Sequence, residues 1–204
     1  MRENVSIISR LTMGLQESWM GAGWYNNYLD QFFPAEVTSD MEKEIAIADL
    51  KDRIKEMQND PDMTISFFGR KAASQWLEPT YGTLNYGYVH GYYWPDHEQA
   101  SWVKEIFDQD GQLRLMLEGF MKAWQQAMYM LVAVGLWRGW RKADHTAQLV
   151  LPLVVLGGFL YHMIFEAKSQ YIYVYMMYLV PLAAQGLCEA ENQIQKLIHR
   201  IKLK

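Results

Sequence analysis

The sequence predicts a mainly α-helical membrane protein: an extracytoplasmic helical domain, then about three transmembrane helices and a basic amphipathic tail. The first observation is the segment 147–165, which contains no Asp, Glu, Lys or Arg. As a helix it would rise about 28 Å, enough to cross the hydrocarbon core of a bilayer. The second observation is another uncharged segment, 171–187, with a tyrosine-rich start that is typical of the headgroup region. The third is the clustering of bases beside these segments.

These observations divide the chain into three parts. Residues 1–118 form the outside helical domain with an aromatic loop, 119–187 the transmembrane part, and 188–204 the basic cytoplasmic tail. The transmembrane helices are expected at about 120–137, 147–165 and 171–187. A net charge of −4 and a pI near 5.7 argue against a nucleic-acid partner.

The segment 120–137 is the weakest of the three spans. Lys122, Gln125 and Gln126 lie in its first turns, although a lysine near a helix end can extend its ammonium to the interface. The alternative is a soluble helical bundle in which all three segments are buried core helices. A chain of 204 residues is short for a core that surrounds them completely.

The bases set the predicted orientation. By the positive-inside rule, the link 137–145 and the carboxy-terminal tail are cytoplasmic, so the turn 166–170, EAKSQ, and all residues before Phe120 lie outside. An outside segment of this length, without a signal peptide or a preceding span, predicts the carboxy-terminal piece of a larger multispan protein. The cytoplasmic bases are Arg138, Arg141, Lys142, Lys196, Arg200, Lys202 and Lys204.

Three helices are predicted in the outside domain, at 39–60, 63–77 and 96–109. Ser39 and Glu42 have the spacing of a capping box at the start of the first. Apolar residues at three- and four-residue spacing mark the faces expected to be buried: Ile47, Leu50, Ile54 and Met57 in the first helix, and Ile65, Phe68, Ala72 and Trp76 in the second.

An aromatic segment, 79–95, separates the second and third of these helices. Its tyrosines and tryptophans suit a membrane interface, and they also suit stacking on sugar rings. His90 and His97 lie in and beside it, but their spacing is not that of a known metal site, so no metal ligand is assigned.

Two segments carry a family resemblance: 165–187, FEAKSQYIYVYMMYLVPLAAQGL, and 67–84, FFGRKAASQWLEPTYGTL. The matching positions are Glu166, Tyr171, Pro181, Ala183 and Ala184 in the first, and Lys71, Gln75, Trp76, Glu78 and Pro79 in the second. The chain resembles bacterial membrane glycosyltransferases of the GT-C type, in the family 39 group of protein mannosyltransferases and the lipid A aminoarabinose transferase. The first segment resembles the last outside turn and last span of that family, and the second is similar to a segment of its Firmicutes members.

The resemblance implies a multi-pass protein of the bacterial cell membrane that takes a sugar from a polyprenyl-phosphate donor, with no cofactor. Its partners would be membrane lipid, this donor and the missing amino-terminal transmembrane part. The donor phosphate would be bound by Glu166, Lys168, Gln170 and Tyr171. The sugar or acceptor would contact Lys71, Gln75, Trp76, Glu78, Tyr92 and Trp94.

The chain departs from the family pattern in two places. The family's catalytic acid, in the first outside loop, has no counterpart here, so no catalytic residue is assigned and the chain alone is expected to be inactive. Gln170 stands where the family often has arginine, and an amide cannot neutralise a phosphate; Lys168 is the expected substitute. The alternatives are an ordinary polar hairpin turn at EAKSQ, and a non-enzymatic membrane-anchored module that binds a glycan or a protein.

Overall fold

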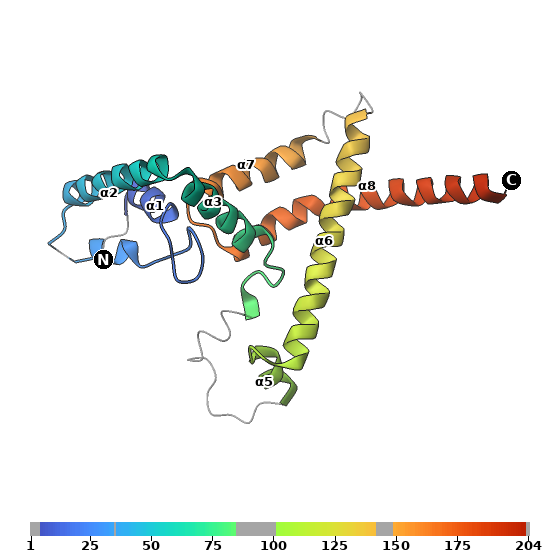
Figure 1. Cartoon of the computed structure of the whole chain (residues 1–204), viewed down its shortest axis with the longest axis horizontal. Coiled ribbons are helices and arrows are strands. Elements are labelled where there is room, and N and C mark those ends of the chain that lie inside the picture. Colours follow the sequence, from blue (N-terminus) through green and yellow to red (C-terminus); the bar gives the residue numbers. More distant parts are fainter. Residues whose placement is uncertain (1–4, 35, 85–100, 142–148, 203–204) are drawn as a thin grey trace. The chain divides into compact units, whose positions relative to one another are not determined.

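A computed structural model describes residues 5–34, 36–84, 101–141 and 149–202, and within these ranges the secondary structure is helical, without strands (Figure 1). The mainly α prediction is therefore confirmed. The helices are α1 (Ile7–Gly14), η1 (Tyr28–Phe32), α2 (Ser39–Asn59), α3 (Pro61–Trp76), α5 (Ser101–Phe107), α6 (Gln112–Arg141), α7 (Val150–Ile164) and α8 (Ser169–Lys202).

The chain forms two compact units. The first contains Met1–Glu78 and Gly158–Tyr171, and the second contains Pro79–Gly157 and Ile172–Lys204. The end of α7, the EAKSQ turn and the first residues of α8 thus belong with the amino-terminal helices.

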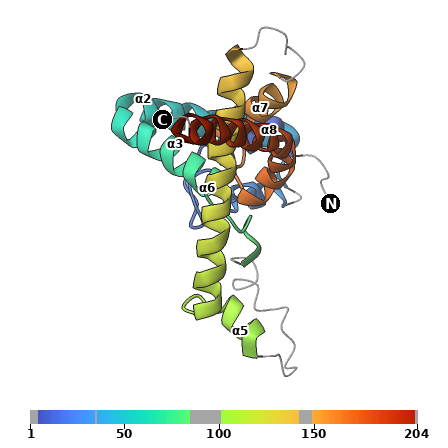
Figure 2. The ribbon, with the colours of Figure 1, turned by 90° about the vertical axis from the view of Figure 1, so that its right-hand side faces the viewer.

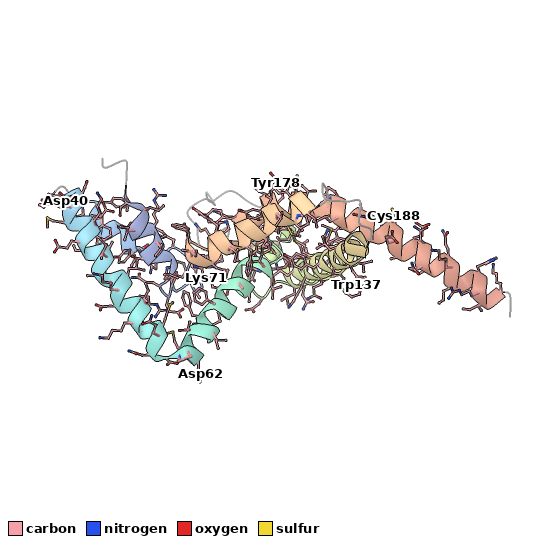
Figure 3. All side chains as sticks on the ribbon, turned by 90° about the horizontal axis from the view of Figure 1, so that it is seen from above. Asp40, Asp62, Lys71, Trp137, Tyr178 and Cys188 are labelled. Atoms are coloured by element: carbon pink, nitrogen blue, oxygen red, sulfur yellow. The ribbon has the colours of Figure 1, made fainter. Side chains whose placement is uncertain are left out.

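In the first unit, α1 packs along α2 (Figure 1). Helices α2 and α3 form a V with Asp62 at its corner (Figure 3). The corner is encoded by Asp60 and Pro61: the Asp60 carboxylate accepts a hydrogen bond from Met63 N at 2.9 Å, and Pro61 occupies the first turn of α3, where no backbone donor is needed.

The predicted capping box of α2 is wrong. Thr38, not Ser39, is the N-cap, and its hydroxyl accepts a hydrogen bond from Met41 N at 3.2 Å. Glu42 is instead buried against α1, where it accepts hydrogen bonds from Ser6 N at 2.7 Å and Ser9 Oγ at 2.8 Å. The carboxylate therefore satisfies free donors at the start of a different helix.

The predicted buried faces of α2 and α3 are also displaced. In α3 the buried residues are Phe67, Lys71 and Gln75, whereas Ile65, on the predicted stripe, is 72% exposed. In α2 the residue with no exposed surface is Ala46, while Ile54 is exposed. In α3 the apolar spacing predicted the wrong buried face, because the polar residues Lys71 and Gln75 are buried there instead.

In the second unit, α6 crosses α8 at a pair of glycines (Figures 1 and 2). Gly135 of α6 lies against the carbonyl of Leu182, and Gly186 of α8 lies against the carbonyl of Leu131, so closely that a Cβ atom at either position would overlap the facing backbone. Helix backbones approach this closely only where a side chain is absent.

Of the helices described, α8 alone is both long and apolar enough to cross a membrane by length and composition. Helix α7 is apolar but has 15 residues, and the predicted span 120–137 lies inside α6, which does not meet the same measure. Three spans are therefore not confirmed. Helix α8 also continues without a break from the predicted span 171–187 to Lys202 in the basic tail.

Candidate functional site

The turn between α7 and α8 brings together three of the four residues predicted to bind a lipid phosphate. Lys168 Nζ lies 3.8 Å from Glu166 Oε1, and the Tyr171 hydroxyl donates a hydrogen bond to Glu166 Oε2 at 3.2 Å. Gln170 is exposed on the first turn of α8. Glu166 is thus the centre of the cluster, and both of its oxygens face a donor.

Two hydrogen bonds attach this turn to α3 and to the segment between α1 and η1. Lys71 Nζ donates to Phe165 O at 2.8 Å, and Ala167 N donates to Gly23 O at 2.9 Å. Gly23 has a φ of 72°, a left-handed conformation that favours glycine. The chain near Gly23 therefore fixes the turn through its backbone.

Lys71 is a structural clamp in this arrangement. Its Nζ also donates to Gly14 O. The side chain therefore binds the carbonyl of the last residue of α1 and the carbonyl of the residue directly after α7. Carbonyls at helix carboxy ends have no partner within their own helix, and one lysine satisfies two such ends. Lys71, labelled in Figure 3, lies on α3 and has no exposed surface.

Burial lowers the pKa of Lys71 to about 7, because the ammonium form is removed from water. The negative ends of two helix dipoles act in the opposite sense and favour the charged form. A neutral amine has two N–H groups, which matches the two carbonyls it serves.

His162 and Tyr171 hold each other in place across the turn. Their rings stack with centroids 5.3 Å apart and planes inclined by 14°. His162 Nδ1 lies 2.9 Å from Glu166 O, and because a carbonyl only accepts, Nδ1 carries the proton. The last turn of α7 thereby fixes both the backbone of Glu166 and the ring of Tyr171.

A cavity of about 590 Å³ opens beside this cluster, within the first unit. Its size is in the range of small-molecule sites. Its polar lining consists of Arg10, Tyr25, His162, Glu166 and Tyr171. The apolar lining includes Val5, Met13, Leu29, Phe33, Tyr161 and Phe165.

Most polar groups in the cavity already have partners inside the protein. The Tyr25 hydroxyl donates to the Asp30 carboxylate, and this hydrogen bond raises the pKa of Tyr25 to about 12. Tyr171 donates to Glu166. Arg10, by contrast, is exposed and makes no ion pair or hydrogen bond through its side chain among the residues that the structure describes.

Of the residues predicted to contact a sugar or acceptor, the structure describes Lys71, Gln75, Trp76 and Glu78, and two of these four are fully buried. Lys71 and Gln75 have no exposed area, so neither is open to a ligand in this structure. The ring of Trp76 lies 5.7 Å from that of Phe159, and Glu78 is half-buried at the end of the first unit. Tyr92 and Trp94 lie outside the described residues, as do His90 and His97. A sugar contact at these positions stays a prediction.

Sequence reasoning missed Arg10, Tyr25 and His162. Arg10 and Tyr25 lie more than a hundred residues before the turn and carry no motif, so only the fold shows that they line the same cavity. His162 could have been identified from the sequence as a candidate site residue, because it is the one histidine in the uncharged segment 147–165.

Within the described part of the chain, no group of three His, Cys, Asp or Glu side chains has the arrangement of a metal site. Comparisons with protein families, curated proteins and solved structures find no match for this chain. Function is therefore inferred from the cavity and the turn themselves.

Proposed function

We propose that this chain is the carboxy-terminal part of an integral membrane glycosyltransferase that uses a polyprenyl-phosphate sugar donor. The observation that carries the proposal is the gathering of Glu166, Lys168 and Tyr171 in one turn between two apolar helices, beside a cavity with apolar walls. A lipid-linked donor needs this combination, because its phosphate requires polar groups at the depth where its chain enters hydrocarbon.

The proposed reaction is a substitution at the anomeric carbon of the donor sugar. The oxygen of an acceptor hydroxyl forms the new bond, the bond to the phosphate oxygen breaks with inversion, and the electron pair leaves with the phosphate. A base takes the hydroxyl proton. We assign that base to the part of the protein upstream of this chain, and we assign stabilisation of the leaving phosphate to this chain.

In this account α6, α7 and α8 cross the bilayer, with the EAKSQ turn and the first unit on the outer face. The outward sides of α7 and α8 support this, because large apolar residues there remain exposed, among them Leu153, Leu156, Tyr173, Met177 and Val180. Exposed apolar surface on this scale is unfavourable in water and suits lipid. The basic residues after 137 and in the tail favour a cytoplasmic carboxy terminus.

The proposal is tested by replacing Lys168 and Gln170 together with alanine in the protein extended by its native upstream sequence. Transfer from a polyprenyl-phosphate sugar should fall by about tenfold or more, because Glu166 then faces the phosphate without its lysine. Lys55→Ala, which removes an exposed lysine of α2, is the matched control. Equal transfer by all three proteins would contradict the donor site.

One observation favours a second candidate, a non-enzymatic membrane-anchored module that binds a glycan or a protein. Glu166 is the one carboxylate among the lining residues of the cavity, and Lys168 and Tyr171 already engage it, so this chain presents no free base there. The native sequence upstream separates the two candidates. Further spans and an acidic first outside loop support the enzyme, and their absence supports the module.

A further inference from the structure

We infer that Arg10 binds the anionic phosphate of the lipid-linked donor in the cavity of the first unit, with the start of the lipid chain against the apolar wall. This inference deepens the proposed function and rests on it. It assigns the phosphate contact to a residue of α1 rather than to Lys168.

Arg10 is the one residue with a permanent positive charge among those that line the cavity. Its guanidinium is always charged near neutral pH and presents a planar fork of N–H donors, which suits phosphate oxygens. Because its side chain has no partner among the described residues, binding a phosphate there breaks no existing ion pair.

The other hydrogen-bond donors that line the cavity already donate to groups of the protein. The hydroxyls of Tyr25 and Tyr171 donate to Asp30 and Glu166, and His162 Nδ1 donates to a backbone carbonyl. A phosphate entering the cavity therefore finds the free N–H groups on Arg10.

Lys168 has a different task in this arrangement. It does not line the cavity, and its ammonium lies 3.8 Å from Glu166 Oε1. The lysine offsets the one negative charge of the lining, and Tyr171 donates to the other carboxylate oxygen. With the Glu166 charge offset by Lys168, Arg10 is the cationic side chain that a ligand meets in the cavity. Under this assignment, phosphate binding does not require a cation at Gln170.

The apolar wall defines the rest of the ligand. Met13, Leu29, Phe33 and Phe165 line the same cavity as Arg10. A volume of about 590 Å³ accommodates a phosphate with a few isoprene units, and a longer chain would extend beyond it. The ligand class is thus an amphiphile with an anionic head, not a free anion.

The test measures binding of farnesyl phosphate to the full chain in lipid nanodiscs by titration calorimetry. Arg10→Gln should weaken binding by about tenfold or more, and Arg10→Lys, which keeps the charge but loses the fork, by less. Lys55→Gln makes the same charge change at an exposed site of α2 and should leave binding unchanged. Farnesol, which lacks the phosphate, should bind weakly and equally to all four proteins.

If Arg10→Gln binds farnesyl phosphate within about twofold of the unsubstituted chain, the assignment to Arg10 is wrong and the donor site itself stands. If the unsubstituted chain does not bind farnesyl phosphate, the proposed donor site fails as well. If inorganic phosphate alone displaces the ligand at equal concentration, the cavity is a free-anion site and the amphiphile is excluded.

Discussion

Lys71 Nζ donates a hydrogen bond at 2.8 Å to the carbonyl of Phe165, a residue 94 positions later in the chain. The bond connects α3 with the end of α7, and a second bond from the same nitrogen reaches Gly14 of α1. The turn that carries Glu166 and Lys168 is therefore positioned by a buried amine that belongs to neither adjoining helix. The position of the candidate site depends on this clamp.

Replacing Lys71 with methionine should destabilise the first unit by about 2 to 4 kcal/mol. Methionine replaces the unbranched stem of the lysine without its amine, so the carbonyls of Gly14 and Phe165 lose their donor where water does not replace it. Thermal unfolding in detergent measures the effect, with exposed Lys55→Met as the control. If Lys71→Met and Lys55→Met lower the stability equally, the hydrogen bonds of Lys71 do not contribute to the stability of the first unit.

The penalty of Lys71→Met should grow as the pH rises. Burial lowers the pKa of Lys71 from 10.5 to about 7, so between these values the unfolded chain binds more protons than the folded one. Folding stability therefore rises with pH across this window, by up to about 1.4 kcal/mol per pH unit, in the protein that contains the lysine. Unfolding free energies of both proteins at about pH 6.5 and about pH 9.5 check this. A pH-independent difference would show that the amine stays charged when folded.

Substitution by alanine should have opposite effects at two helical glycines, one at the crossing of α6 and α8 and one in α6 away from it. Gly186→Ala places a Cβ against the Leu131 carbonyl and should destabilise the second unit by about 1 to 3 kcal/mol. Gly119→Ala, where no atom lies within 4 Å of the added Cβ, should stabilise α6 by up to about 1 kcal/mol. Melting temperatures in detergent report both changes. Shifts of the same sign would argue against the close approach.

Gln170→Arg should raise affinity for farnesyl phosphate by about tenfold, because it adds a charged fork beside the proposed donor site. The position is exposed on the first turn of α8, so the longer side chain displaces no buried group. Gln58→Arg on the exposed face of α2 adds the same charge elsewhere and should leave affinity unchanged. An equal gain in both variants would indicate a general charge effect rather than a contact at the turn.

The sequence predicted the helices well because their ends carry strong local signals. Asp60 and Pro61 separate α2 from α3, and the uncharged segments 147–165 and 171–187 correspond closely to α7 and the first half of α8. Local signals do not define which face is buried. Lys71 and Gln75 look like surface residues in sequence, yet they have no exposed area, because the partners of Lys71 are carbonyls of distant segments.

The candidate site was predictable only in part. Glu166, Lys168 and Tyr171 lie within six residues of one another, so a motif in the turn was enough to group them. Arg10 and Tyr25 join them through the packing of α1 and the segment before η1, which no short-range pattern encodes. The unsatisfied Gln75 amide, buried without a hydrogen-bond partner, has no explanation in the described structure.

We propose that α8 crosses a bilayer with its first turn outside and its basic end inside. Cys188 is the one cysteine of the chain, so a Cys188→Ser background allows single cysteines to be placed at Gln170 and Lys196, both exposed on α8. These positions are about 39 Å apart along a helix, more than one hydrocarbon core. The measurement is labelling by a membrane-impermeant maleimide added to intact cells. We predict that Gln170→Cys is labelled at once and Lys196→Cys only after permeabilisation; labelling of both in intact cells, or of neither until the cells are opened, would contradict the account.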